Sequence, residues 1–496
     1  MPRRAIILVL VVWLFFMSIM GLVTFPNHYN FRTFGDLAYI SQVLENHSKG
    51  YFVPKYLSSS NFYGEEGWVV VPHAAPTYHL ALPFYWIGGV WGALVYQWLL
   101  VGLGGLGLFL YAKHRLKDWR AGLLSMIHYF GMWGLVSLLA FDWHEVLIWI
   151  PFVLYGIEQR KWWIAFLTWL FFIGSKESAA LWGVWIALIL VFVYKAPEER
   201  RFLLVAGGIA ALWFAIAYFL YKPDIPAHSR MNLYSYLGAD DPIAALQSGQ
   251  VPPFSFKRIV RTLLLRPQLV WTLLWESPYP DGVGIKSELH WSVLWSGGWA
   301  FVFQPLFLLL LLPVYMYKLL ASDYMIWGTL YHYSVEFAVI LPIAVLWAAQ
   351  RWKGNWRCWT LLAAGALGAH IMGFSLLEKR VSKWYEAERH RWYAPQHYHS
   401  PYNYSKIHEG LRLIPPQASV SAVSRLISHI PPRWEYYHFP AGLSKVEYIA
   451  LLREDPNPWP VGSAKLIQFI DSLEKSPSWE KIWDKDKLVV FHRRSS

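Results

Sequence analysis

The sequence has a single cysteine, Cys358, and few charged residues for a chain of 496 residues. One cysteine excludes a disulfide within the chain and any zinc site built from cysteines. Charged residues make up 15% of the chain and hydrophobic residues 56%, which is too apolar for one soluble domain. The composition therefore indicates a membrane protein that crosses the bilayer several times.

Two further patterns are missing. A glycine-rich phosphate loop of the nucleotide-binding kind is absent, because the glycines at 102–105 lie inside an apolar run, where small residues more often let helices pack closely. A soluble nucleotide-sugar donor is therefore not indicated. The chain shows no convincing internal repeat either, which weakens the case for a transporter.

Apolar runs of spanning character fill most of residues 1–376. The first run is roughly the 20 residues that a bilayer crossing needs, so we expect a retained start-transfer helix rather than a cleaved signal peptide. Trp and Tyr crowd the run ends, as expected at lipid–water interfaces. We predict about ten or more spans, with 259–275 undecided between spanning, re-entrant and flat; the runs are 5–24, 90–111, 121–140, 146–157, 162–173, 179–194, 202–221, 299–317, 335–349 and 359–376.

The formal charge of +12 comes from cations in short clusters between these runs. A nucleic-acid partner is not indicated, because the cations do not line one polar surface. By the positive-inside rule the basic loops are cytoplasmic, and the N-terminus lies with them. The basic positions are Arg3 and Arg4, Lys113 to Arg120, Arg160 and Lys161, Lys195 to Arg201, and Arg351, Lys353 and Arg357.

The alternate connections bear acids, imidazoles and hydroxyls, and should face outward together with the first outer loop (25–89) and the segment 222–292. Charged groups at membrane depth are costly unless they are paired or solvated. Each group could simply cap its helix at the headgroups, but three such loops on one face favour a shared polar cavity. The residues are Asp142, His144 and Glu145, then Lys176 and Glu177, then Tyr331 and His332, with Gln42 and His73 in the first loop.

An amphipathic helix is predicted in the first outer loop, because Leu37, Ile40 and Leu44 have helical spacing. We expect this helix to lie along the interface with Asp36 in its first turn. An acid there has two explanations of equal weight: it complements the helix dipole, or it is available for chemistry.

Residues 377–496 differ in character, since charged and polar residues become frequent and no spanning run follows. Alternating apolar stretches at 418–423 and 487–491 predict strands, and the pattern at 467–473 predicts a helix. The segment should form a small α/β domain, which the topology places outside the cytoplasm. Its aromatic entry, 384–404, either binds sugar by stacking or packs on the membrane surface, and we favour packing.

Four motifs occur in the order and spacing of a known family. They are Asp36-Leu37-Ala38-Tyr39-Ile40-Ser41-Gln42, Phe141-Asp142-Trp143-His144-Glu145, Lys176-Glu177 and Tyr331-His332-Tyr333-Ser334. With the tail around Ile414 to Val420, they resemble the DUF2079 family of predicted bacterial membrane proteins, which looks like a branch of the GT-C glycosyltransferase superfamily. Members usually have a second acid where this chain has Ser41, so a two-carboxylate scheme in that helix is in doubt.

The resemblance implies a mainly α-helical, polytopic GT-C-like domain (1–376) in the bacterial inner membrane. It also implies a transferase that takes sugar from a polyprenyl-phosphate donor on the extracytoplasmic face. Such chemistry needs a base near the acceptor hydroxyl and cations at the departing phosphate. We assign Asp36 as the base and Lys176 and His332 as phosphate contacts, with the other candidate residues lining the pocket. Lys176 has an equally weighted alternative, an ion pair with Glu177.

The sequence leaves both the metal content and the function of the protein open to more than one interpretation. Five candidates are of metal-ligand types: Asp142, His144, Glu145, His73 and Glu177. An oxygen-rich set suits Mg²⁺ or Mn²⁺, whereas added imidazoles favour Zn²⁺. No spacing among the five is diagnostic, so no cofactor is assigned. A non-catalytic scaffold or sensor of the same fold, or a lipid or solute transporter, remains an alternative function. The enzyme hypothesis makes a geometric prediction: Asp36, His144, Lys176 and His332 converge on one outward-open cavity.

Overall fold

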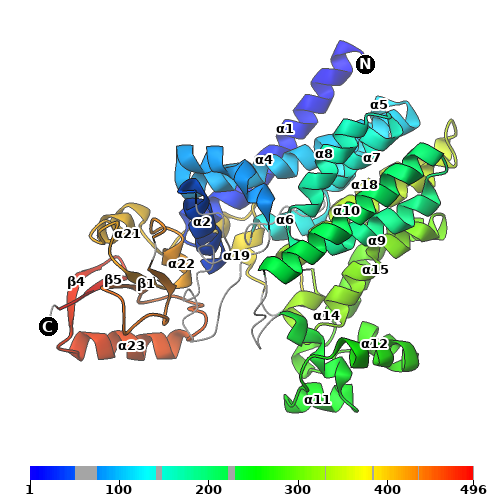
Figure 1. The fold of residues 1–496 in the computed structure, drawn as a ribbon. Coiled ribbons are helices and arrows are strands. Elements are labelled where there is room, and N and C mark those ends of the chain that lie inside the picture. The colour runs from blue at the N-terminus through cyan, green and yellow to red at the C-terminus, as the bar shows by residue number, and fades with distance from the viewer. Residues whose placement is uncertain are drawn as a thin grey trace. The chain divides into compact units, whose positions relative to one another are not determined.

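The computed structural model describes residues 1–50, 75–140, 148–221, 230–329, 331–381, 385–433 and 435–494. Most of these residues are helical, and the chain divides into two compact units. The first unit holds residues 1–20, 99–139 and 144–390, and the second holds 21–98, 140–143 and 391–496 (Figure 1). Helices α1 (Arg3–Tyr29) and α4 (Leu82–Leu116) each contribute residues to both.

The first unit is built almost wholly from apolar helices. Helix α17 (Val335–Gln350) is buried on nearly all sides and packs against neighbours both close and distant in sequence. The other helices are α5 (Trp119–Phe130), α6 (Trp133–Leu139), α7 (Ile150–Glu158), α8 (Trp162–Ile173), α9 (Glu177–Val193), α10 (Pro197–Tyr221), α11 (Pro242–Ser248), α12 (Phe256–Leu265), α13 (Pro267–Trp275), α14 (Ile285–Trp295), α15 (Pro305–Leu319), α16 (Tyr324–Trp327), α18 (Trp356–Glu378) and α19 (Ala387–His390), with short 3-10 turns η2 (Arg230–Gly238), η3 (Pro280–Gly282), η4 (Gly298–Val302) and η5 (Tyr331–Ser334).

Several of these helices turn large apolar side chains outward. Ile7, Leu14 and Phe15 of α1 are each more than half exposed, and only 22% of the apolar window of α10 and 33% of that of α18 is buried. A helix that is apolar all round needs either a protein core or a bilayer to cover it. Membrane helices are therefore supported by the exposed surface as well as by composition.

The described ranges contain five helices long and apolar enough to cross a membrane, or six if the bent pair α5 and α6 forms one span. Three shorter apolar helices, α8, α9 and α15, accompany them. The count of about ten or more spans stays a prediction. The five are Arg3–Tyr29, Pro76–Leu116, Pro197–Tyr218, Tyr324–Gln350 and Trp356–Glu378.

The stretch 259–275 forms parts of two short helices instead of one. Helix α12 has 10 residues and α13 has 9, with the break at Arg266 and Pro267. At about 1.5 Å of rise per residue, each covers roughly half of the hydrocarbon thickness. Both pack with η2 and α11 around a small apolar core of their own that includes Tyr236, Leu246 and Leu273.

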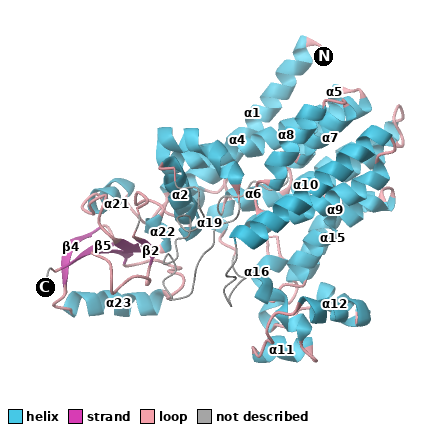
Figure 2. Ribbon diagram, in the orientation of Figure 1, coloured by secondary structure: helices cyan, strands magenta, loops and turns pink. Residues whose placement is uncertain are grey.

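The second unit contains a five-stranded sheet of order β2-β1-β3-β5-β4 (Figure 2). Its strands are β1 (Val420–Ala422), β2 (Tyr436–His438), β3 (Tyr448–Leu452), β4 (Trp479–Lys485) and β5 (Leu488–Arg493). β1 pairs in parallel with β2 and β3, whereas β5 pairs antiparallel with β3 and β4. Together with α23 (Ser463–Lys475), these strands confirm the small C-terminal α/β structure. The domain boundary at 377 stays a prediction.

The same unit joins the loop after α1 to the C-terminal segment. The Arg32 guanidinium donates to three carbonyl oxygens around α20 (Pro395–Tyr398): His397 at 2.6 Å, Gln396 at 2.9 Å and His399 at 2.5 Å. Arg425 Nη1 donates to the carbonyl of Phe31 at 3.1 Å. Residues nearly 400 positions apart in the chain thus form one packed structure.

The helix predicted in the first outer loop is confirmed as α2 (Gly35–Ser48). It packs against α22 (Ser424–Ile427) and η1 (Pro76–Ala81), while α21 (Tyr404–Leu411) packs on β4 and β5. α2 is buried on most of its circumference rather than along one stripe. The polar residues of α2 therefore sit in a protein environment.

Candidate functional site

Asp36 lies in the first turn of α2, as predicted from the sequence. Its carboxylate is near the positive end of the helix dipole, which stabilises an acid there. Asp36 is partly exposed, whereas Leu37, next in the chain, is fully buried. The acid is therefore held by a packed helix and is still reachable.

The two polar residues at the centre of α2 have different environments. Ser41 is fully buried and its hydroxyl donates to the carbonyl of Leu37 at 2.7 Å. A hydroxyl so engaged cannot act as a second carboxylate in this helix. Gln42 is buried too, and its Nε2 donates to the carbonyl of Arg433 at 3.0 Å. Within the described residues, its Oε1 has no hydrogen-bond donor and remains an available acceptor.

In the first unit, Lys176 occupies the N-cap position of α9 with an extended backbone, and Glu177 begins the helix. Glu177 complements the dipole of α9 there. The charge of Lys176 also acts on Glu336 in the first turn of α17. Lys176 thus interacts electrostatically with Glu336, an acid that the sequence hypothesis did not include. An ion pair between Lys176 and Glu177 stays a prediction.

The Tyr331–Ser334 motif forms η5, directly before α17. Tyr331 has a φ of 55°, in the left-handed region that bulky residues rarely adopt. The preceding turn is held by the Ser137 hydroxyl of α6, which donates to the carbonyl of Thr329 at 2.9 Å. Gly134 lies so close to the Ser334 carbonyl that a Cβ there would collide with it. Neighbouring helices therefore impose this backbone conformation.

Two buried charged residues beside η5 were missed by the sequence analysis. Lys318 is fully buried near the end of α15, and its Nζ donates to the carbonyl of Tyr333 at 2.9 Å and the hydroxyl of Ser334 at 3.1 Å. Glu336 is 6% exposed, and the charge of Lys318 acts on it. Lys318 directly follows the predicted run 299–317, and Glu336 is the second residue of the run 335–349. A charge at the end of such a run usually reaches water. Burial next to a family motif is the property that singles them out.

Further polar groups surround the same motif. His332 is buried with its ring against Tyr333, the centroids 4.2 Å apart. Arg389 of α19 is 2% exposed, and its charge acts on Tyr331. Three cations thus lie near enough to η5 or Glu336 to interact with them: Lys176, Lys318 and Arg389. Cations and imidazoles so placed can hold a phosphate, or they can simply neutralise Glu336.

Arg380, just after α18, reinforces this region from another side. Its Nη2 donates to the Ser137 hydroxyl at 3.2 Å and its Nη1 to the carbonyl of Thr329 at 3.3 Å. Burial lowers the pKa of Arg380 to about 10, against the opposing effect of Glu288. The guanidinium remains charged at neutral pH and orders the turn that leads into η5.

The predicted site residues are divided between the two units and the ranges outside the described structure. His73, Asp142, His144 and Glu145 lie outside the described residues. Asp36 and Gln42 belong to the second unit, and Lys176, Glu177, Tyr331 and His332 to the first. Convergence on one cavity therefore stays a prediction. Among the residues that the structure describes, no three His, Cys, Asp or Glu side chains are grouped as metal ligands.

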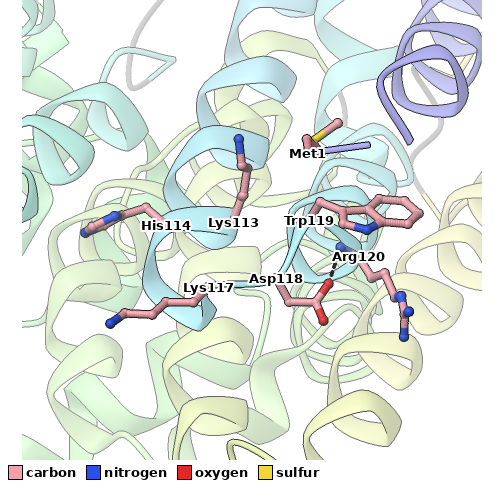
Figure 3. A pocket seen from close by; sticks show the side chains of 7 residues that line it. All are labelled: Met1, Lys113, His114, Lys117, Asp118, Trp119 and Arg120. Carbon is pink, nitrogen blue, oxygen red and sulfur yellow. Dashed lines mark hydrogen bonds between the residues drawn. The ribbon is translucent and has the colours of Figure 1, made fainter. Parts of the chain in front are cut away.

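A hollow of about 390 Å³ lies over the basic loop between α4 and α5 (Figure 3). The Asp118 carboxylate accepts from the backbone N–H of Arg120 at 2.8 Å and so caps α5. Lys113, Lys117 and Arg120 point in different directions around it. These cations match a loop that flanks the membrane better than a converging anion site.

A second hollow, of about 330 Å³, is lined by Phe25, Tyr29, Trp91 and Tyr398 among others, and belongs to the second unit. Tyr404 stacks on Tyr29 with centroids 4.4 Å apart. Part of the aromatic entry at 384–404 is therefore engaged in packing against the end of α1.

Comparison with known proteins agrees with the apolar helices. A family model described as "Predicted membrane protein (DUF2079)" matches residues 3–489. Among curated proteins, none matches the chain. Because the family model covers nearly its whole length, this chain belongs to the DUF2079 family of predicted membrane proteins.

Proposed function

We propose that this membrane protein is a GT-C-type glycosyltransferase that moves a sugar from a polyprenyl-phosphate donor to an acceptor outside the cytoplasm. The observation that best supports the proposal is the set of buried cations around η5. Lys318 and Arg389 are almost fully buried there, and Lys176 acts on the adjacent Glu336. A phosphate gains charge as its bond to the sugar breaks, and cations fixed beforehand in a water-poor site stabilise that charge.

In the proposed reaction, Asp36 accepts the proton of the acceptor hydroxyl as that oxygen attacks the anomeric carbon. The bond from that carbon to the phosphate oxygen breaks, and the lipid phosphate leaves with the electron pair, inverting the configuration. Lys176 and His332 contact the phosphate, and Lys318 joins them. Of the other predicted residues, Gln42 offers its Oε1 to a donor hydroxyl, and the pocket is lined by His73, Asp142, His144, Glu145, Glu177 and Tyr331.

The proposal includes the topology. The chain lies in the bacterial inner membrane with its N-terminus in the cytoplasm, and 377–496 lie outside, on the side of the acidic and imidazole-bearing loops. A divalent Mg²⁺ or Mn²⁺ ion is compatible with the acids among the site residues, but the scheme above needs none. Membrane lipids surround the chain, and the donor reaches the site from among them.

The test is to incubate the purified protein with radiolabelled polyprenyl-phosphate sugars and compare wild type with Asp36→Asn. We expect Asp36→Asn to lower the transfer rate by about 10²- to 10⁴-fold while donor binding persists, because only the base is lost. Glu45→Gln is the matched control, since Glu45 is an acid of the same helix, paired with Lys49 at 3.0 Å. It should retain transfer.

The enzyme hypothesis fails if wild type neither binds nor consumes any donor and Asp36→Asn leaves the cellular phenotype unchanged. That result would favour a scaffold or sensor. Movement of labelled lipid across vesicles without sugar transfer would instead favour a transporter.

A further inference from the structure

Helix α12 presents three different faces. Ile259 and Thr262 are buried, and Ile259 packs with Leu273 of α13 in the small core shared with η2 and α11. The other two faces of α12 are exposed, one apolar and one cationic. The helix is thus amphipathic even after its core face has been covered.

The exposed apolar face contains large side chains at helical spacing. Phe256 is 71% exposed and Leu264 is 73% exposed, and they lie eight residues apart with Val260 midway. In α13, Trp271 and Trp275 lie one turn apart and are 64% and 46% exposed. Their ring centroids are 5.8 Å apart. Paired exposed tryptophans beside leucine and phenylalanine are typical of segments that lie at a lipid–water interface.

The cationic face lies next to the apolar one on the helix. It consists of Lys257, Arg258 and Arg261, all exposed. Within the part of the chain that the structure describes, these three side chains form no ion pair or hydrogen bond. Arg266 differs, because its Nη1 donates to the carbonyl of Asp240 at 2.6 Å. Three cations are therefore available to an external anion.

The position of this segment in the first unit agrees with a membrane surface. Tyr234 donates to the carbonyl of Tyr317 at 2.8 Å, and Tyr236 to that of Leu320 at 2.9 Å. These two bonds fix η2, which shares a core with α12 and α13, to the C-terminal end of the apolar helix α15 (Figure 1). If α15 lies in the bilayer, its end marks the level of the headgroups.

We propose that α12 and α13 form an interfacial anchor that binds the anionic headgroups of the surrounding bilayer. Phe256, Leu264 and Trp271 insert among the lipid chains, and Lys257, Arg258 and Arg261 contact lipid phosphates. An amphipathic helix buries its apolar edge at this depth while its cations stay at the charged surface. The inference is independent of sugar transfer, because a scaffold or a transporter would use the same anchor.

The first experiment measures depth. Cys358→Ala removes the native cysteine, and a fluorophore is attached to Leu264→Cys or, as control, to Gln247→Cys on the exposed side of α11. The full chain is placed in nanodiscs whose lipids have brominated acyl chains. We expect bromine to quench the label at 264 severalfold more than the label at 247, and aqueous iodide to show the reverse order.

The second experiment measures charge. The protein is placed in nanodiscs that contain both anionic and zwitterionic lipids and is then extracted from them. The lipids that stay bound to the protein are quantified by native mass spectrometry. Lys257→Gln with Arg261→Gln should lower the anionic preference, roughly fivefold for each cation removed. The matched control replaces two exposed lysines of α23, Lys465→Gln and Lys475→Gln, and should change little.

Each result decides the proposal. It is supported if the label at 264 responds to the lipid quencher and the α12 double variant loses anionic lipid. A label at 264 that iodide reaches as readily as the label at 247 would overturn it. So would a label shielded from both quenchers, which indicates a protein partner, or an α12 double variant that keeps as much anionic lipid as the control.

Discussion

His28 and His429 stack face to face, with ring centroids 4.2 Å apart and ring planes 7° from parallel. His429 Nδ1 also lies 3.3 Å from His408 Nε2, so three imidazoles meet in the second unit. Burial, and then the neighbouring imidazoles, hold the pKa of His429 well below its usual value. Burial and the charge of Arg412 also lower the pKa of His408. The cluster is therefore packed for neutral rings.

We expect the second unit to lose stability in acid. His429 stays neutral in the folded protein, whereas the unfolded chain binds a proton near its usual pKa of about 6.5. The contribution of His429 to the free energy of unfolding is fully present above about pH 6.5. As the pH falls below this value, the contribution decreases by up to about 1.4 kcal/mol per pH unit until the folded ring also binds a proton. Thermal unfolding between about pH 8 and about pH 5 tests this. His429→Phe keeps an aromatic ring and should show a shallower slope; equal slopes would contradict the account.

Arg425→Ala should destabilise the second unit strongly. Arg425 Nε donates to Asp455 Oδ1 at 2.9 Å, and both side chains are buried, so removal leaves an uncompensated buried carboxylate. The expected loss is about 3–5 kcal/mol of unfolding free energy. Arg453→Ala is the control, because Arg453 pairs with Glu474 and Asp484 while partly exposed. Its expected loss is about 1 kcal/mol or less, and similar losses in the two variants would refute the difference.

The charges beside η5 should show energetic coupling. Lys318→Met removes a cation that acts on buried Glu336, and we expect a loss of about 3–5 kcal/mol, because the carboxylate keeps only part of its compensation. Adding Glu336→Gln should restore part of that loss, with a coupling energy of about 0.5–3 kcal/mol in the double-mutant cycle. Chemical unfolding of the four proteins in detergent measures this coupling. Additive losses would mean that the two residues do not interact.

Gly134→Ala should disturb the candidate site by simple overlap. A Cβ at 134 meets the Ser334 carbonyl, so α6 or η5 must shift, at a cost of about 1–3 kcal/mol. In the same unit, a Cβ at Gly208 would have nothing within 4 Å, which makes Gly208→Ala the matched control. Melting temperatures should fall for the first variant and stay nearly constant for the second. If both variants melt like wild type, the packing at η5 is looser than the structure indicates.

Sequence patterns predicted those features that depend on local periodicity. Helices α2 and α23 and strand β5 follow from the spacing of their apolar residues, because each period places them on one face. The burial of Lys318 and Glu336 could not be predicted in this way, since charges at the ends of apolar runs usually reach water. The break of 259–275 at Pro267 had a signal, because proline lacks the N–H that a continuing helix needs. No sequence signal indicated the contacts of Arg32, because every residue has a backbone carbonyl that could accept a hydrogen bond.

The hydrogen bonds from Arg32 to the carbonyls around His397 also have a consequence for the synthesis of the protein. The loop after α1 is translated before its carbonyl acceptors, which follow up to 367 residues later. At about 5–20 residues per second, the ribosome needs roughly 20–70 s to supply them. Through that interval the loop must persist without its final partners, so a cell that makes this protein has to protect the loop until its acceptors have been translated.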